Sequence, residues 1–357
     1  MTSLATASSN ASISLDNTRI HAQLLRFFDL LVHELGGDLN HYLRSLDIGS
    51  GAESDALNEI SFRDQIRLLE FAAEQLACSD LGLRLAMKQS GSGIFGPLGE
   101  VMRSASTYGE ALEYAHRHAY VNSLATEMWL TPVDQERALF AGHEILLDRL
   151  PRRQQVMELI MLSGSLTAQE LTGGKTRAKR VHLRHQPISS MQTYHRYFGC
   201  EIRFDEPHYG ILFSNRDLRQ PLITHDPSAF SDAAAFVETH FLSRRPPTHA
   251  KVRGLVLRRL GLFNCSNEAV AQILNMHPRT LHRHLRAEGT TFQRIKDEVR
   301  RDLLLYFLHQ TDLDLVKISE RLGFAEQSVM TRRCHAWFAA SPSRIRTERI
   351  GHSVATH

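Results

Sequence analysis

Cysteine is scarce in this chain of 357 residues, and its spacing excludes the structures that cysteines usually build. The four cysteines are Cys78, Cys200, Cys265 and Cys334. No two of them have the separation of about two to four residues that is typical of a zinc-binding pair, and they are too few and too scattered for a disulfide framework. The pattern predicts reduced, mostly buried thiols in a cytoplasmic protein.

Long apolar runs are missing too. No stretch approaches the roughly 18 apolar residues of a membrane-spanning helix, and no short apolar segment follows the start as in a secretory signal. We therefore expect a cytoplasmic protein that has no membrane partner. Residues 1–17 are rich in Ser, Thr and Asn, which predicts a disordered tail.

The motifs of common cofactor and metal sites are absent as well. The 20 histidines include no His-Glu-x-x-His sequence. Segment 91–99 is rich in Gly, but it lacks the Lys-Ser/Thr of a phosphate-binding loop and does not follow a strand. The sequence predicts no cofactor, no metal site and no catalytic residue, and hence no enzyme.

The charge is unevenly divided. Residues 250–350 hold 18 Lys plus Arg against 10 Asp plus Glu, a net charge of +8. The whole chain holds 42 against 39, so the remainder holds 24 against 29, a net charge of −5. A basic C-terminal third beside an acidic remainder is typical of a nucleic-acid-binding module attached to a second functional unit.

The basic third contains one short pattern twice. Residues 268–285 and 316–333 align at an offset of 48 positions (322 minus 274). The aligned pairs are Leu274 with Leu322, Asn275 with Gly323, Met276 with Phe324, Leu281 with Val329, and His284 with Arg332. Each copy predicts a short apolar helix, a turn and a second helix with a basic face. This is a repeated helix-turn-helix, and it indicates DNA binding.

In the N-terminal part, helical and strand patterns alternate. The predicted helices lie at 24–35, 39–46, after the cap Ser61, at 81–87, after the cap Thr107, at 152–171 and before Gly199. The predicted strands are 125–130 with 137–143 as one hairpin, 180–184, and 201–204 with 209–213 as a second hairpin. Helices interleaved with hairpins predict an α+β domain.

The C-terminal segment resembles the DNA-binding domain of AraC/XylS-type transcriptional regulators. The matching segments are Thr280–Phe292, Leu322-Gly-Phe324 and Ser341–Arg346. The resemblance implies two helix-turn-helix units joined by a long helix, which the apolar spacing here places at about 292–308. The second unit departs from the family pattern, since Met330 and Cys334 replace the usual Phe and Ala339 replaces the usual Gly.

The N-terminal part resembles the domain called "arabinose-binding-like" in regulators of the ornithine-utilisation type. The matching segments are Gly96–Gly99, Ser106–Leu112, Tyr197–Phe204 and Asp217–Leu222. The resemblance implies a ligand-sensing domain without naming the ligand.

These patterns divide the chain into four parts, with Pro246-Pro247 as the clearest boundary. They are a disordered tail (1–17), an α+β sensing domain (18–225), a linker with one helix (226–249) and an all-α double helix-turn-helix domain (250–350).

The residues expected to contact DNA lie on the second helix of each unit, on the face opposite its apolar residues. Arg can donate two hydrogen bonds to guanine, and shorter polar residues reach bases or phosphates. The candidates are Arg279, His282, Arg283 and Arg286 in the first unit, and Gln327, Ser328, Thr331, Arg332 and Arg333 in the second. Because the first unit holds more long donors, we expect it to supply more of the base contacts, with Arg333 at the phosphates.

Candidates for the effector site lie around the first predicted hairpin. His116, Tyr120, Trp129 and His143 combine aromatic surface with polar atoms. Isolated residues of these types also occur in ordinary cores, so composition alone does not separate the two roles.

Together, the resemblances imply a sequence-specific transcriptional regulator whose N-terminal domain senses a small metabolite. Activation is the commoner mode in the family, which favours an activator that meets RNA polymerase at promoter DNA. Segment 152–171 is a candidate homodimer surface, although its apolar stripe is also typical of core packing. The alternatives are a DNA-binding protein with a degenerate sensor and a DNA-repair alkyl-transfer enzyme, which would need a cysteine cluster that this chain lacks.

Overall fold

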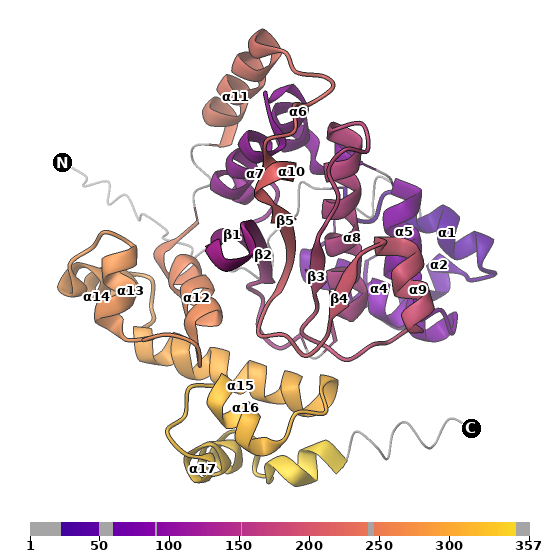
Figure 1. The fold of residues 1–357 in the computed structure, drawn as a ribbon. Helices are drawn as coiled ribbons and strands as arrows, with labels where there is room; N and C mark the ends of the chain where they lie inside the picture. Colours follow the sequence, from indigo (N-terminus) through magenta and orange to yellow (C-terminus); the bar gives the residue numbers. More distant parts are fainter. Residues whose placement is uncertain (1–22, 50–59, 90, 151, 242–245, 348–357) are drawn as a thin grey trace, which may run out of the picture.

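The computed structural model describes residues 23–49, 60–89, 91–150, 152–241 and 246–347. The predicted disordered tail lies outside these residues. An N-terminal part built on one sheet lies above a helical C-terminal part (Figure 1). The expectation of an α+β domain followed by an all-α domain is confirmed.

The N-terminal part contains short helices around one long buried helix. Its helices are α1 (Phe28–Glu34), α2 (Leu39–Ser45), α4 (Phe62–Gln75), α5 (Leu81–Gln89), η2 (Ser92–Phe95), α6 (Gly96–Ser104), α7 (Tyr108–Arg117), η3 (Ala119–Val121), η4 (Asp134–Glu136), α8 (Gln154–Leu171), α9 (Met191–Phe198), α10 (Asn215–Leu218) and α11 (Pro227–Phe241). Two of the predicted caps are present. Ser61 Oγ accepts a hydrogen bond from the Asp64 amide at 3.1 Å, and Thr107 Oγ1 accepts one from the Glu110 amide at 3.2 Å.

In the part of the chain that the structure describes, five strands form a single sheet. They are β1 (Thr126–Val133), β2 (Ala138–Ile145), β3 (Arg180–His182), β4 (Glu201–Arg203) and β5 (Tyr209–Ser214), in the order β1-β2-β5-β3-β4. The first predicted hairpin is confirmed, because β1 pairs with β2 in antiparallel register.

The second predicted hairpin is wrong. Strand β3 lies between β4 and β5, pairing parallel with β4 and antiparallel with β5. The segments 201–204 and 209–213 are close in sequence, which favours a hairpin, but the short connection between them spans the width of one inserted strand. A local pattern does not reveal a strand that enters from a distant part of the chain.

Helix α8 forms the centre of the N-terminal core. Its buried residues lie on every side of the helix, so the apolar stripe predicted at 152–171 serves core packing. At its first turn, Glu70 accepts hydrogen bonds from the amides of Gln155 and Val156 at 2.8 and 3.4 Å. A carboxylate from another helix thus satisfies amides that have no partner within the helix.

Helix α5 packs on α8 so closely that no side chain fits between them at Gly82. A Cβ atom at this position would overlap the backbone carbonyl of Gln155, and the Gly82 amide already donates to Gln155 Oε1 at 2.7 Å. A glycine is therefore required by the approach of two helices.

Gly82→Ala should lower the free energy of unfolding by about 1–3 kcal/mol, because the backbones must separate to admit one methyl group. Chemical denaturation of the full chain measures the change. Gly93→Ala is the matched control, since its Cβ would meet only the end of the Arg26 side chain at 3.6 Å. Equal changes in the two variants would refute this account of the α5–α8 contact.

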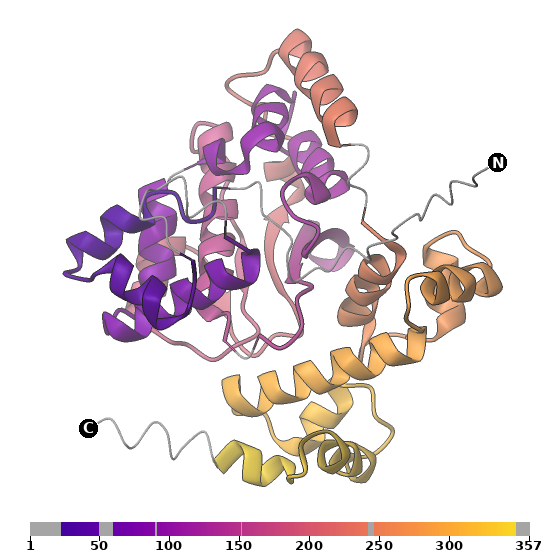
Figure 2. The ribbon, with the colours of Figure 1, turned by 180° about the vertical axis from the view of Figure 1, so that it is seen from behind.

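Helix α11 extends the N-terminal core at the end farthest from the helical part (Figure 2). It belongs to the predicted linker, and it packs along α6 with Val237 fully buried in the same core as the sheet. Phe230 and Phe241 are partly buried against that core.

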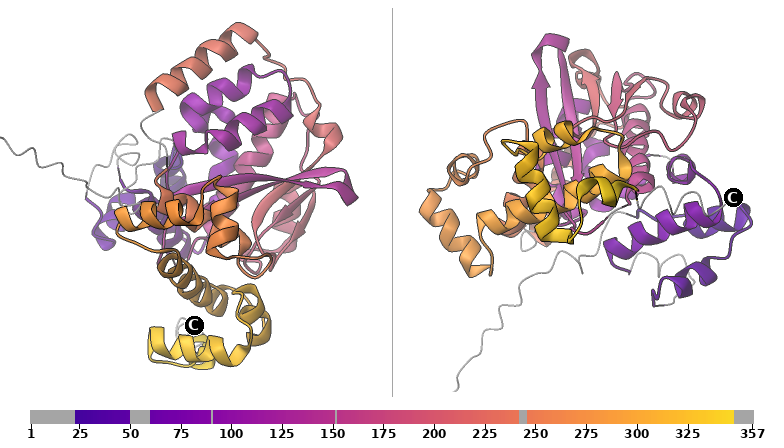
Figure 3. Two further views of the ribbon diagram at one scale, coloured as in Figure 1. Left: turned by 90° about the vertical axis from the view of Figure 1, so that its left-hand side faces the viewer. Right: turned by 90° about the horizontal axis from the view of Figure 1, so that it is seen from below.

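The C-terminal part is helical and has a core of its own, and six of its helices lie wholly within the described residues. They are α12 (Thr248–Arg259), α13 (Asn267–Ile273), α14 (Pro278–Ala287), α15 (Phe292–Gln310), α16 (Leu315–Arg321) and α17 (Gln327–Phe338). Helices α13–α14 and α16–α17 are the two predicted helix-turn-helix units, and α15 joins them. Figure 1 shows α12 between the first unit and the sheet and α15 above the second unit, and the left-hand view in Figure 3 shows the second unit, in yellow, below the sheet.

Candidate nucleic-acid interface

The two helix-turn-helix units share one backbone geometry at their turns. Asn275 and Gly323, which align in the sequence repeat, both have left-handed backbones with φ of 52° and 62°. Gly and Asn are the residues that tolerate this conformation best. The repeat in the sequence is therefore a repeat in structure.

Helix α14 presents a basic face to solvent. Its first turn is fixed by the His277 ring, whose Nδ1 accepts a hydrogen bond from the Arg279 amide at 3.2 Å, and by Pro278 at the first helical position. Leu281 and Leu285 are fully buried on the opposite face. The structure leaves all four predicted contact residues of this unit exposed: Arg279, His282, Arg283 and Arg286.

Helix α17 presents a less basic face. Gln327, Ser328, Arg332 and Arg333 are exposed, whereas Thr331 is half-buried. Two hydroxyl groups already have partners in the protein: Ser328 Oγ donates to Glu326 Oε2 at 2.9 Å, and Thr331 Oγ1 donates to the Gln327 carbonyl at 3.1 Å. The second unit therefore offers fewer free long donors than the first.

The departures from the family pattern in α17 are accommodated within its core. Met330 and Cys334 are fully buried. Ala339 ends the helix with φ of 54°, a left-handed conformation that glycine adopts with less strain. This explains why the family usually has Gly there.

The two units are fastened to one another beyond the helix that joins them. Arg300 of α15 donates to the carbonyls of Leu322 and Gly323 in the turn of the second unit, at 2.9 and 2.5 Å. Gly261, in the loop before the first unit, has a left-handed backbone packed against the carbonyl of Arg321. The helix-turn-helix units are thereby held in one relative orientation.

The N-terminal domain contributes a residue to the core of the C-terminal domain. Leu146, just after β2, is buried among the residues of α12 and α15. Beside it, Arg253 of α12 donates to the Leu146 carbonyl and forms an ion pair with Asp302 of α15 at 2.9 Å. The two domains are therefore packed together and are not merely linked in sequence.

Strand β1 packs directly on α12. The guanidinium of Arg258 lies over the Trp129 ring at 5.8 Å, and the Trp129 ring covers Gly142 of the neighbouring strand. Two residues earlier, the Glu127 carboxylate lies against Gly254, where a Cβ atom would overlap it.

A buried cluster of charges and aromatic rings lies at the centre of the junction. Glu144 is bracketed by Arg184 at 2.7 Å and Arg153 at 3.3 Å, and all three side chains are at most 5% exposed. Arg153 lies over the ring of Tyr306 on α15 at 4.7 Å, and the hydroxyls of Tyr306 and Tyr209 are 2.6 Å apart. Burial opposes the charged form of Glu144, but Arg184 and Arg153 outweigh it and hold its pKa below the ordinary value.

Further hydrogen bonds join the N-terminal domain to the end of α15 and to α16. The Gln310 side chain accepts from Gln154, and the Gln310 carbonyl accepts from the Gln186 amide at 3.3 Å. Arg321 of α16 donates to the Asp205 carbonyl. The N-terminal domain thus contacts α12, which precedes α15 in the chain, and α16, which follows it.

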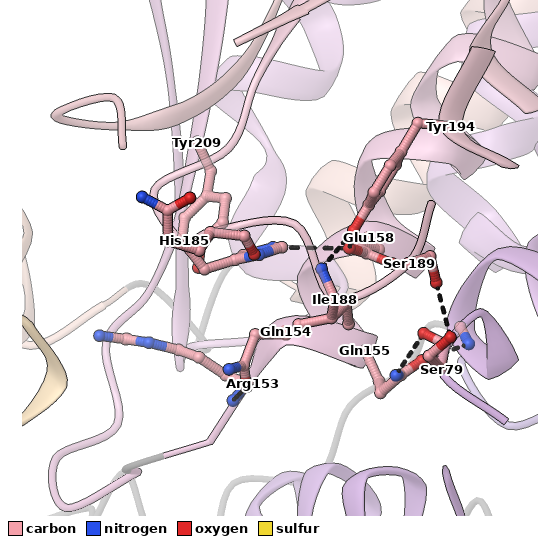
Figure 4. A network of polar contacts seen from close by, with 12 residues as sticks. Ser79, Arg153, Gln154, Gln155, Glu158, His185, Ile188, Ser189, Tyr194 and Tyr209 are labelled. Carbon is pink, nitrogen blue, oxygen red and sulfur yellow. Dashed lines mark hydrogen bonds and ion pairs between the residues drawn. The ribbon is translucent and has the colours of Figure 1, made fainter. Parts of the chain in front are cut away.

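A second buried cluster connects this junction with the interior of the N-terminal domain (Figure 4). Glu158 of α8 is fully buried and accepts a hydrogen bond from the Tyr194 hydroxyl at 2.5 Å, while His185 Nε2 is 3.7 Å away. Burial raises the pKa of Glu158 well above its ordinary value and lowers that of His185 to about 4. Burial thus favours the neutral form of both groups, and the neutral form is the less costly one in a fully buried location.

The structure does not bring the four predicted effector residues together. Trp129 lies on the face of β1 that meets α12, whereas His143 pairs with Met128 in register and points to the opposite face. His116 Nδ1 is 2.9 Å from the Met128 carbonyl, and Tyr120 lies near His118, with ring centroids 5.9 Å apart. Burial lowers the pKa of His143 to about 4. These residues belong to at least two separate surfaces.

The thiols show no activation. All four cysteines are free, and burial raises the pKa of Cys78, Cys200 and Cys334 to about 11 in each case. Among the described residues, no group of three or more potential ligands is placed to hold a metal ion. In the same residues, no helix combines the length and apolar character needed to cross a membrane.

Sequence reasoning missed the residues that join the domains, chiefly Leu146, Glu144 and Tyr306. A signal existed for Tyr306, because residues 303–308 are apolar or aromatic without interruption. Such a run surrounds the helix, and a helix that is apolar on all sides must be covered on all sides. Leu146 and Glu144 carried no comparable signal.

Comparison with known proteins assigns both domains. Residues 36–222 match the family described as "Arabinose-binding domain of AraC transcription regulator, N-term", and residues 270–348 match the family described as "Helix-turn-helix domain". The first match covers more than half of the chain.

Two curated proteins resemble nearly the whole chain. The "HTH-type transcriptional regulator VirS" of Mycobacterium tuberculosis is 34% identical over 316 residues, which are 88% of this chain and 93% of that protein. The "Ornithine utilization regulator" of Pseudomonas aeruginosa is 29% identical over 80% of this chain and 84% of that protein. The crystal structure of the regulator CdpR from Pseudomonas aeruginosa is more distant, with 18% identity, coverage of 89% and 98%, and a TM-score of 0.43.

Proposed function

The chain belongs to the AraC family of DNA-binding transcriptional regulators, and from this premise we propose that it reads two successive major grooves of a promoter under the control of a small metabolite. The observation that supports the proposal best is the pair of helix-turn-helix units, each with an exposed polar face and both fastened to α15. Neither the family matches nor the relatives identify the metabolite.

The length of α15 suits this geometry. Its 19 residues, at about 1.5 Å each, extend over roughly 28 Å. Successive major-groove faces on one side of a duplex are about 34–36 Å apart. The flanking turns supply part of the difference, and a modest bend of the DNA supplies the rest. One chain can therefore occupy two adjacent grooves.

We assign base contacts mainly to Arg279 and Arg283 of α14, which stand one helical turn apart near the start of the helix. In recognition helices the N-terminal residues reach base edges. His282 and Arg286 flank them on the same exposed surface. In α17, Gln327 and Arg332 are the remaining base-reading candidates, with Ser328 and Thr331 in supporting positions and Arg333 at the phosphates.

Single alanine variants separate these roles. Arg283→Ala and Arg332→Ala should each reduce discrimination between a specific and a random duplex by about 1–3 kcal/mol, because each loses contacts with a base. Arg333→Ala should weaken binding to all duplexes alike and lower the slope of log K against log salt by about one. Binding titrations at several salt concentrations measure both effects.

The duplex for these titrations is obtained by selecting from a random library with the wild-type protein and locating its footprint. The selection also tests the proposed function itself, because a non-specific packaging protein would enrich no sequence. If all three variants lost the same affinity on specific and random duplexes, the division into base and phosphate contacts would be refuted.

We further propose that the protein activates transcription, with RNA polymerase as its partner at the promoter, and that it acts as a monomer or homodimer on DNA. The direct packing of the N-terminal domain on α12, α15 and α16 supports control of DNA binding by a ligand, since a change in one domain must alter contacts with the other. A reporter gene behind the selected sequence tests the sign of regulation. Size-exclusion chromatography with light scattering, with and without DNA, tests the oligomeric state.

A further inference from the structure

A crevice lies between the two domains, beside the first helix-turn-helix unit. It has a volume of about 180 Å³, and its walls come from three places: the start of β1, the first turns of α12, and the end of α13. Leu124 and Leu146 contribute from the N-terminal domain, Leu255 from α12, and Ile273 and Leu274 from α13. The walls are mainly apolar, and Ile273 is 39% exposed.

One acidic side chain, Glu127, lines this crevice. Glu127 is half-buried, and its Oε2 atom is shielded from solvent and accepts no hydrogen bond. Burial raises its pKa to about 7, against the opposing influence of Arg258. Its Oε2 packs against Gly254 of α12, and a carboxylate that lines an apolar crevice in this way is costly for the protein and attracts a cationic group of a ligand.

A basic side chain lines the same crevice. Lys251, on the first turn of α12, is exposed and carries a flexible ammonium group. A ligand held at Glu127 therefore presents its other end near a positive charge. A neutral or anionic group is tolerated there, and a second ammonium is repelled.

The volume of the crevice suits a small molecule. A protein cavity of about 150 Å³ accommodates benzene, so this crevice accepts an apolar body of that size with one polar group attached.

We propose that this crevice is the effector site and that it takes a small organic amine, with the ammonium at Glu127, an apolar body against the leucines, and a neutral or anionic end toward Lys251. This proposal rests on the proposed function, because it names the site and ligand class of the metabolite control. It differs from the candidate site at His143, which lies on the opposite face of the sheet.

The position of the crevice allows a bound ligand to influence the DNA-contacting helix α14. Ile273 and Leu274 end the first helix of the helix-turn-helix unit, and the turn at Asn275 leads directly into α14. A ligand that fills the crevice contacts this turn and the N-terminal domain at once. Binding thereby changes the support of the helix that carries Arg279 and Arg283.

Isothermal titration calorimetry of the full chain with benzylamine tests the ligand class. We expect binding by the wild-type protein, at least about ten-fold weaker binding of benzyl alcohol, and a similar loss for benzylamine in Glu127→Gln, because the charged hydrogen bond is removed in both cases. Leu124→Trp, which fills the crevice from one wall, should abolish binding. Absence of benzylamine binding, or binding unaffected by these changes, would overturn the proposal.

A reversal of specificity provides a second test that does not depend on loss of function. The wild-type protein should reject 1,6-diaminohexane, and Lys251→Glu should bind it, because the second ammonium then meets a carboxylate. Residue 251 is exposed, so this change leaves the cores intact. Equal rejection by both proteins, while the melting temperature is unchanged, would contradict the role of Lys251.

The effector role is tested on the selected duplex. Saturating benzylamine should change the Kd of the wild-type protein for DNA by at least about five-fold, the lower range of ordinary allosteric coupling. Amine binding without any such change would overturn the assignment as effector site. A failure of the proposed function gives a different result. In that case the ligand-free protein would select no DNA sequence from the library, whatever its affinity for amines.

Discussion

Alanine at both Arg279 and Arg283 is expected to remove most of the sequence selectivity of the protein, by about 2–6 kcal/mol or at least roughly 30-fold. Each guanidinium can form a bidentate contact with guanine, and the two residues share one exposed face of α14, four positions apart. The helix is fixed beneath them by buried Leu281 and Leu285. Truncation therefore removes contacts without disturbing their support.

The matching pair in the second unit should matter less. Gln327→Ala with Arg332→Ala removes one long cationic donor instead of two, and the neighbouring hydroxyls of Ser328 and Thr331 are engaged within the protein. The measurement is the ratio of Kd values for the selected duplex and a scrambled duplex. A larger loss of selectivity from the second pair would reverse the ranking of the two units.

The control for charge is a double variant far from DNA. Arg117→Ala with Arg196→Ala also removes two positive charges, from side chains that are 65% and 66% exposed on the N-terminal domain. It should leave the selectivity ratio unchanged. Any general effect of net charge on DNA affinity would appear equally in this variant.

Glu144→Gln is expected to lower the free energy of unfolding by about 3–5 kcal/mol. The change keeps the size of the side chain but removes the negative charge that both Arg153 and Arg184 contact in the interior. Breaking a buried ion pair from one side is costly because the remaining charge keeps its desolvation penalty without compensation.

The chain offers both a reporter and a matched control for this test. Its two tryptophans are Trp129 at the junction and Trp337 on α17, so Trp337→Phe leaves a single fluorescent probe beside the domain contact. Glu298→Gln breaks the pair with Arg294 at 3.0 Å on the solvent side of α15, where about 0.3–0.5 kcal/mol is expected. A loss at Glu144 no greater than at Glu298 would show that the buried cluster does not stabilise the junction.

The sequence predicted well those elements that depend on residues only a few positions apart in the chain. Ser61 and Thr107 fix their helices through amides three residues away, and the helix-turn-helix repeat shows itself in the match of Asn275 with Gly323. The exposed face of α14 follows from the spacing of Leu281 and Leu285. Each of these features requires only local geometry.

The elements that sequence did not predict depend on partners distant in the chain. The insertion of β3 between β4 and β5 brings segments about 30 residues apart into one ladder. In α15, periodicity identified Ile295, Val299 and Leu303 as inward-facing, yet Tyr306 is equally buried because the other domain covers it. A periodic pattern shows that a face is buried and does not show what buries it.

The candidate effector residues illustrate the same limit. His116, Tyr120, Trp129 and His143 were grouped because they lie near one hairpin in the sequence. Alternation along β1 and β2 places Trp129 and His143 on opposite faces of the sheet. The crevice beside Glu127 is assembled from residues up to 150 positions apart (274 minus 124), so no local motif marks it.

The position of Leu146 bears on how regulators of this kind can be recombined. The chain divides in sequence near Pro246, but one side chain of the core around α12 and α15 is supplied by residue 146. A hybrid that joins residues 246–347 to a foreign N-terminal domain would leave a hole in that core and an uncovered Tyr306 unless the incoming domain supplied substitutes. Exchange of DNA-reading modules between relatives is therefore restricted to partners that carry a compatible apolar residue directly after strand β2.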